Sequence, residues 1–209
     1  MECDLLVAGI PRSGSTAVAR MLHGGRQVFL IEPRLHRRRG RWPPRKGGDR
    51  VGIKEVNHLA IEAALTLRPN HVLVLVRNPM HAILSHNEAK YQQGLRKWKS
   101  MDSQMVGIEA TGEVLMRLVD EGHPFVRYED WTSNLASLRS VLLPWGWQLE
   151  SSPDFSAICP NRTYEVERHG GGVTSRSVRL RAHQLAKGGE DLDDFRRRML
   201  PFLERFGYE

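Results

Sequence analysis

The sequence has few cysteines and no long apolar run. Cys3 and Cys159 are the only cysteines among 209 residues, and their spacing fits neither a zinc site nor a redox motif. No apolar segment approaches the roughly 18 residues that a membrane-spanning helix needs. The first four residues, MECD, are acidic, whereas a secretory signal peptide starts with positive charge. These absences predict a cytoplasmic protein without a transmembrane segment.

The composition is otherwise ordinary. Hydrophobic residues make up 40% of the chain and charged residues 26%, which is typical of a globular protein and excludes a disordered tail or a membrane bundle. A chain of 209 residues fits a single domain and can bury roughly 70% of its unfolded surface. We therefore expect one domain over residues 1–209 that needs no disulfide or metal to fold.

The net charge of +7 comes from one segment. Residues 34–50 contain eight basic residues and a single acid, Asp49, so the rest of the chain is neutral in sum. Prolines and glycines in the same segment oppose regular structure. We expect a mobile basic loop at 34–50, which is either simply solvated or attracts an anionic cosubstrate or acceptor. A nucleic-acid-binding protein would often spread its basic residues over one face, so no nucleic acid is expected as a partner.

Short apolar runs alternate with helical patterns along the chain. Strands are predicted at 4–9, 28–31, 51–56, 71–76 and 125–127. Helices are predicted at 16–22, 59–65, 79–93, 104–121 and 132–142, and from about residue 190. Residues 150–188 are polar and are expected to form an irregular loop region. The alternation predicts an α/β fold with a parallel sheet flanked by helices, which binds ligands at the carboxyl ends of its strands.

A loop typical of phosphate binding follows the first predicted strand. Residues 9–16 fit the pattern G-x-x-x-x-G-x-[ST] between a strand and a helix, where backbone N–H groups can point at an anion. The loop lacks the lysine of nucleotide hydrolases: Ser15 stands in that place, and the cation is Arg12. The strand at 71–76 also ends in Arg77 instead of a magnesium-binding acid. Both features disfavour ATP hydrolysis.

Arg77 and Ser85 form a second candidate phosphate site. If a helix starts near Pro79, Ser85 lies roughly 9 Å along it, within partial reach of a long arginine side chain. Arginine can bind phosphate through two hydrogen bonds, and a hydroxyl can add a third. The alternative interpretation is a proline-started helix beside a surface arginine.

Together the two motifs resemble those of sulfotransferases that use 3′-phosphoadenosine 5′-phosphosulfate (PAPS). In that family a loop of this type binds the 5′-phosphosulfate, and an R-x-P…S segment, matched by Arg77 and Ser85, binds the 3′-phosphate. The matching loop residues are Pro11, Arg12, Ser13, Gly14, Ser15 and Thr16. Residues 126–131 (VRYEDW) resemble the family's R-Y-E-D-L element, and residues 206–208 (FGY) resemble its G-Y ending. The resemblance implies a P-loop-like sulfotransferase architecture, PAPS as donor and 3′-phosphoadenosine 5′-phosphate (PAP) as product.

Sulfuryl transfer requires both reactants to be positioned in line and the charge on the bridging oxygen to be stabilised. Arg12 is the first candidate for stabilising this charge, because it lies in the loop itself. Lys54 is the second, since the resemblance implies that a lysine on this strand contacts the transferring group. The resemblance also implies that a late basic loop, with Arg176, closes over the nucleotide. No metal is expected, because cations and N–H dipoles can stabilise the charge.

The general base has several candidates. Family members with a Lys-x-His strand use that histidine, but Val56 stands in its place in this sequence. Glu32 is predicted as the base, because it resembles the glutamate after the second strand in tyrosylprotein and some carbohydrate-specific relatives. Glu55, His36 and His58 are the alternatives. A base has to come within hydrogen-bond reach of the acceptor.

The sequence therefore predicts metal-independent sulfuryl transfer from PAPS to a hydroxyl or amine of a small-molecule, carbohydrate or natural-product acceptor. Trp98, Trp145 and Trp147 are candidate walls for the acceptor pocket, although core packing is the more ordinary role. Two other functions stay open. A small P-loop kinase or nucleotidase would turn over ATP with magnesium, whereas a non-catalytic module that holds an anionic ligand would bind with steep salt dependence.

Overall fold

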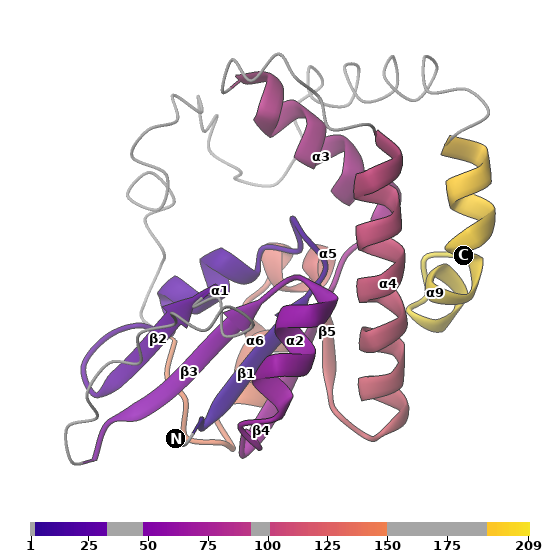
Figure 1. Cartoon of the computed structure of the whole chain (residues 1–209). Helices are drawn as coiled ribbons and strands as arrows, with labels where there is room; N and C mark the ends of the chain where they lie inside the picture. Colours follow the sequence, from indigo (N-terminus) through magenta and orange to yellow (C-terminus); the bar gives the residue numbers. More distant parts are fainter. Residues whose placement is uncertain (1–2, 33–47, 93–100, 150–191) are drawn as a thin grey trace.

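A sheet of five parallel strands lies at the centre of the molecule (Figure 1). The computed structural model describes residues 3–32, 48–92, 101–149 and 192–209. The strand order is β2-β3-β1-β4-β5, and every pairing is parallel. The strands are β1 (Leu5–Gly9), β2 (Gln27–Ile31), β3 (Arg50–Glu55), β4 (His71–Val76) and β5 (Phe125–Arg127). The predicted α/β fold is therefore confirmed.

Helices cover both faces of the sheet, α2 and α4 in front of it and α5 and α6 behind it in Figure 1. The helices are α1 (Ser15–Met21), α2 (His58–Leu65), α3 (Pro79–Gln92), α4 (Met101–Asp120), α5 (Tyr128–Ser133), α6 (Ala136–Leu142) and α9 (Leu200–Arg205), and residues 192–198 are also helical. Among the described residues, no helix combines the length and apolar character needed to cross a membrane.

Alternate side chains of each strand point to opposite faces of the sheet and fill two separate cores. Leu6 and Ala8 of β1 pack into the cluster that includes residues of α2, α4 and the 192–209 segment. Leu5 and Val7 pack into the cluster that includes residues of α1, α5 and α6. Because both faces of β1 are covered, the strand is apolar at every position. This double burial holds the carboxyl end of β1, and the loop that follows it, in a fixed place.

The helix predicted over 132–142 is wrong, because two helices occupy this region. α5 begins directly after β5, and Thr132 lies inside it, where its Oγ1 donates to the carbonyl of Tyr128 at 2.7 Å. Asn134 is extended, with φ of −152°, and its Oδ1 accepts from the N–H of Ala136 at 2.8 Å. An asparagine side chain in this position starts a new helix.

Of the candidate pocket tryptophans, Trp145 lies at the amino end of the sheet and Trp147 lies in the core. Trp147 is completely buried in the core on the α1 side. Trp145 stacks on His71, the first residue of β4, with ring centroids 4.6 Å apart. Trp98 lies outside the described residues, as do positions 34–47 of the predicted basic loop and the whole predicted loop region 150–188. Arg50, the last residue assigned to the basic loop, is the first residue of β3.

The parallel strands bring most of the predicted functional residues to one edge. Since all five carboxyl ends meet there, the order across the edge follows the strand order. From β2 to β5 it reads Glu32, then Lys54 and Glu55, then the loop at 10–14, then Arg77, and finally Tyr128. Neighbouring strands are about 4.8 Å apart, so β3 and β4 stand about 10 Å apart on either side of the loop.

Candidate functional site

The loop after β1 turns twice through left-handed backbone conformations. The φ angles are 70° at Arg12 and 78° at Gly14. The N–H of Ser13 donates to the carbonyl of Ile10 at 3.1 Å, which closes the turn. The N–H groups of Gly14, Ser15 and Thr16 have no hydrogen-bond partner among the described residues. Successive open N–H groups in such a turn form a concavity that suits an anion.

Two glycines allow the loop to pack closely. A Cβ atom on Gly9 would lie 2.5 Å from the Oγ of Ser13, and one on Gly14 would lie 2.3 Å from the ring of Trp131. Ser13 itself is fully buried, and its Oγ has no partner in the described part of the chain. An unsatisfied buried hydroxyl costs about 1–3 kcal/mol. An oxyanion in the loop could offset this cost.

Arg77 is held between the loop and α5. Its side chain is buried, with the residue only 7% exposed, and its Nη1 donates to the carbonyl of Arg12 at 2.8 Å. The guanidinium also lies over the ring of Tyr128, 4.2 Å from the centroid. The register explains this contact, because Val76 pairs with Arg127 and the residues that follow them therefore leave the sheet side by side. Arg77 thus fixes the direction of the Arg12 carbonyl.

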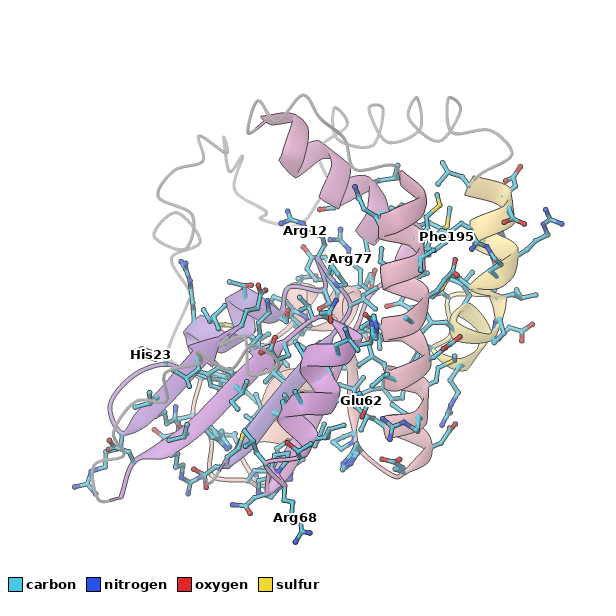
Figure 2. All side chains as sticks on the ribbon, viewed as in Figure 1. Arg12, His23, Glu62, Arg68, Arg77 and Phe195 are labelled. Carbon is cyan, nitrogen blue, oxygen red and sulfur yellow. The ribbon has the colours of Figure 1, made fainter. Side chains whose placement is uncertain are left out.

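The two predicted phosphate motifs form one cluster. The Nε of Arg12 donates to the Oγ of Ser85 on α3 at 3.3 Å. Figure 2 shows Arg12 and Arg77 close together at the carboxyl edge of the sheet, whereas Arg68 lies at the opposite end. The structure therefore brings Arg12, Arg77 and Ser85 together. Two cations and a hydroxyl beside open N–H groups can bind a ligand with more than one phosphate or sulfate group.

Lys54 and Glu32 form an ion pair on the other side of the loop. The Lys54 side chain is 3% exposed, whereas the Glu32 side chain is 52% exposed. Glu32 follows β2 with a left-handed φ of 51°, and its N–H donates to the carbonyl of Lys54 at 2.9 Å. A buried ammonium group needs a partner of opposite charge, and Glu32 supplies it. The exposed part of the carboxylate remains accessible from solvent.

Glu55, one of the alternative bases, is a buried carboxyl group. The residue is 2% exposed, and its Oε1 has no hydrogen-bond partner among the described residues. Burial, with a smaller contribution from the charge of Glu32, raises the pKa of Glu55 to about 7, although Lys54 opposes the shift. Glu55 can therefore exchange a proton near neutral pH. The Nδ1 of His58 is also buried and unpartnered within the described segments.

Arg176 and His36 lie outside the described residues, so their predicted roles stay predictions. Tyr128 and Glu129 both contact the Arg77 segment, although neither is among the residues predicted to have a functional role. Their position directly after the last strand of the predicted sheet is the feature that could have identified them as candidate functional residues. In the described ranges, no group of three or more His, Cys, Asp or Glu side chains is placed to hold a metal ion.

No family model matches the chain, and no curated protein matches it at a significant level. Solved structures do match. The sulfotransferase domain from the curacin biosynthetic pathway is 16% identical with a TM-score of 0.55, covering 85% of this chain and 83% of that chain. Mouse sulfotransferase SULT7A1, crystallised with PAP, is 13% identical with a TM-score of 0.56, covering 95% and 84%. The chain therefore has the fold of these sulfotransferases.

The close packing around Gly14 can be tested by comparing it with Gly25, a glycine of similar backbone conformation. Gly14 and Gly25 both have left-handed φ angles, of 78° and 56°, but nothing lies within 4 Å of a Cβ on Gly25. We expect Gly25→Ala to lower the free energy of unfolding by about 1 kcal/mol. Gly14→Ala should lower it by about 2–4 kcal/mol, because it also displaces Trp131. Urea denaturation measures both values, and equal losses would contradict the packing of the loop.

The raised pKa of Glu55 predicts a pH-dependent stability. The folded protein holds this proton more tightly than the unfolded chain, whose glutamate pKa is near 4.5. The stabilisation is complete below about pH 4.5 and is lost as the pH rises through about 7, and it amounts to at most about 3 kcal/mol. Glu55→Gln removes this titration, so the stability of the variant relative to wild type should increase from pH 5 to pH 8.

Urea denaturation at several pH values measures the difference. The control is Glu204→Gln, at an exposed glutamate on α9. Its stability relative to wild type should stay constant over the same range. A constant difference for Glu55→Gln as well would show that the Glu55 carboxyl does not titrate as described.

Proposed function

We propose that the protein is a sulfotransferase that moves a sulfuryl group from PAPS to a hydroxyl or amine of an acceptor. The observation that carries the proposal is the pair of contacts at Arg12. Its Nε donates to Ser85, and its carbonyl accepts from Arg77. These contacts join two motifs, more than 60 residues apart in the sequence, into one cation-rich cluster beside the open N–H groups of the loop. The sulfotransferase fold is consistent with that cluster.

Donor binding is assigned to the cluster as a whole. In this proposal, residues Pro11–Thr16 hold the 5′-phosphosulfate, and Arg77 and Ser85 hold the 3′-phosphate. Arg176 is proposed to contact the nucleotide as well. The unpartnered Oγ of Ser13 and the buried guanidinium of Arg77 support a multiply charged ligand, because each gains from an oxyanion nearby. The mouse structure in the comparison was crystallised with PAP.

The proposed reaction is an in-line displacement at sulfur. The acceptor oxygen or nitrogen attacks, the bond between sulfur and the bridging phosphate oxygen breaks, and PAP leaves with the electron pair. Arg12 stabilises the charge on the leaving oxygen, and Lys54 lies beside the transferring group. Glu32 takes the proton of the acceptor. Its ion pair with Lys54 supports this role, because it keeps the base next to the cation beside the transferring group.

The acceptor is proposed to be a small molecule, a carbohydrate or a natural product. One structural neighbour is a domain of a natural-product pathway, which supports the last of these classes. The absence of the P-loop lysine, with Ser15 in its place, makes a kinase or nucleotidase the weaker candidate. A non-catalytic module that binds an anionic ligand is the other alternative. The cytoplasmic location remains a prediction from the sequence.

Calorimetry with PAP and with ATP, both without magnesium, tests the proposal. We expect PAP to bind at least tenfold more tightly than ATP, because only PAP has phosphates at both the 3′ and 5′ positions. Tight binding of ATP with no preference for PAP would support the kinase or nucleotidase alternative. Binding of neither nucleotide would reject the proposed donor site and favour the non-catalytic module.

Arg12→Ala should abolish most of the sulfuryl transfer. Removing one group that stabilises charge in a transition state typically costs about 10²–10³-fold in kcat. PAPS hydrolysis or transfer to an active acceptor provides the assay. Arg68→Ala is the control, because Arg68 is an exposed arginine at the opposite end of the sheet (Figure 2). Activity of Arg12→Ala equal to that of Arg68→Ala would remove Arg12 from the mechanism.

A further inference from the structure

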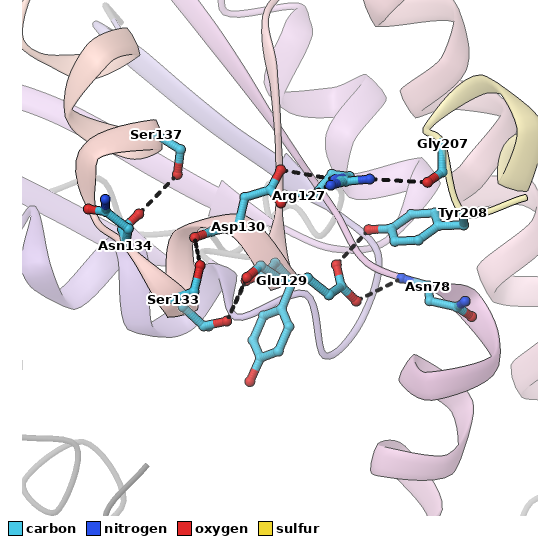
Figure 3. A network of polar contacts seen from close by, with 11 residues as sticks. Asn78, Arg127, Glu129, Asp130, Ser133, Asn134, Ser137, Gly207 and Tyr208 are labelled. Atoms are coloured by element: carbon cyan, nitrogen blue, oxygen red, sulfur yellow. Dashed lines mark hydrogen bonds and ion pairs between the residues drawn. The ribbon is translucent and has the colours of Figure 1, made fainter. Parts of the chain in front are cut away.

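Glu129 of α5 contacts two segments that are distant in the sequence (Figure 3). Its Oε1 accepts from the backbone N–H of Asn78 at 3.4 Å. Its Oε2 accepts from the hydroxyl of Tyr208 at 2.8 Å. One carboxylate therefore bridges the residue after Arg77 and the aromatic residue of the G-Y ending.

The segment on one side of this bridge belongs to the proposed donor site. Asn78 follows Arg77 and caps α3, because its Oδ1 accepts from the N–H of Met80 at 2.9 Å and its carbonyl accepts from the N–H of Ala82 at 2.9 Å. α3 carries Ser85, which contacts Arg12. A shift of Asn78 would therefore move both Arg77 and the start of the helix that presents Ser85.

Neighbouring residues of α5 hold neighbouring residues of the donor site. Tyr128 holds the side chain of Arg77 through its ring, and Glu129 holds the backbone of Asn78. The position of α5 thus determines the position of the proposed 3′-phosphate site through two separate contacts.

The segment that contains Tyr208, on the other side of the bridge, is firmly fixed. Arg127 forms two hydrogen bonds with Asp130, both at 2.9 Å, and a third with the carbonyl of Gly207 at 3.1 Å. The N–H of Tyr208 donates to the carbonyl of Leu203 at 2.9 Å. Burial and the charge of Glu129 raise the pKa of the Tyr208 phenol above its usual range, while Arg127 opposes the shift. The phenol therefore remains a donor to Glu129 at physiological pH.

We propose that Tyr208 and Glu129 are positioning residues for the donor nucleotide. The Tyr208 hydroxyl orients the Glu129 carboxylate, and Glu129 fixes Asn78 and with it Arg77 and the start of α3. This inference rests on the proposed function, because it assumes that Arg77 and Ser85 bind the 3′-phosphate. Neither Tyr208 nor Glu129 needs to touch the nucleotide.

Tyr208→Phe tests the proposal, since it keeps the ring and removes only the hydroxyl. We expect it to weaken PAP binding by roughly 2- to 30-fold, the range for couplings carried through packed residues. Binding of adenosine 5′-monophosphate, which lacks the 3′-phosphate, should weaken by a smaller factor. A general loss of structure would weaken both nucleotides, so the ratio of their dissociation constants is the decisive quantity.

Arg196→Gln is the matched control. Arg196 forms an ion pair with Glu209, next to Tyr208, but it does not contact Glu129. It should leave the affinity ratio at the wild-type value. An equal change in Arg196→Gln and Tyr208→Phe would overturn the proposal, because it would indicate a general effect of loosening this end of the chain.

A double-mutant cycle tests the route through Glu129. Glu129→Gln should lower the affinity ratio too, and the Tyr208→Phe/Glu129→Gln double variant should be no weaker than Glu129→Gln alone. Fully additive losses would show that Tyr208 acts independently of Glu129. If wild-type protein fails to bind PAP, the proposed function is rejected. If wild type binds PAP and Tyr208→Phe binds it equally well, only the positioning role is rejected.

Discussion

The candidate site depends on how the Arg77 guanidinium is accommodated at the carboxyl edge of the sheet. A buried guanidinium is costly unless hydrogen bonds and opposing dipoles compensate it. The Arg12 carbonyl and the Tyr128 ring provide this compensation from opposite segments of the chain. The Arg12 carbonyl can take this direction because its residue adopts a left-handed conformation, with φ of 70°. The strained loop, β4 and α5 are therefore parts of one arrangement.

The order of the strands divides the candidate site into two sides. β1, which carries the loop, lies at the centre of the sheet, with β3 on one side and β4 on the other. The acidic groups Glu32 and Glu55 lie on the β3 side, together with Lys54, whereas Arg77 lies on the β4 side. A group transferred from a nucleotide in the loop would therefore move away from the cationic β4 side of the site. It would move toward the β3 side, which contains proton acceptors. This separation suits a reaction in which one partner is highly charged and the other loses a proton.

Local sequence patterns predicted the strands well, because each strand is a short apolar run between polar turns. The loop after β1 was equally clear from its glycines and its place after the strand, whereas its binding of phosphate stays a prediction. The helix predicted over 132–142 was wrong, since the Thr132 hydroxyl is satisfied within α5 and the extended backbone at Asn134 separates the two helices. The contact between Arg77 and Tyr128 needs the β4–β5 register, which no local pattern contains. Arg176 and His36 remain predictions, as does the single-domain organisation over residues 1–209.

The bridge from Glu129 to Tyr208 also bears on the order of folding. Its two residues are 79 positions apart, so the contact closes a long loop for the gain of one hydrogen bond. The contacts within the sheet and between β5 and α5 span shorter separations or involve more groups, and they are expected to form earlier. The geometry around Arg77 would then be completed in one of the last steps. Nucleotide affinity would consequently report on the final stage of folding, after the sheet itself has assembled.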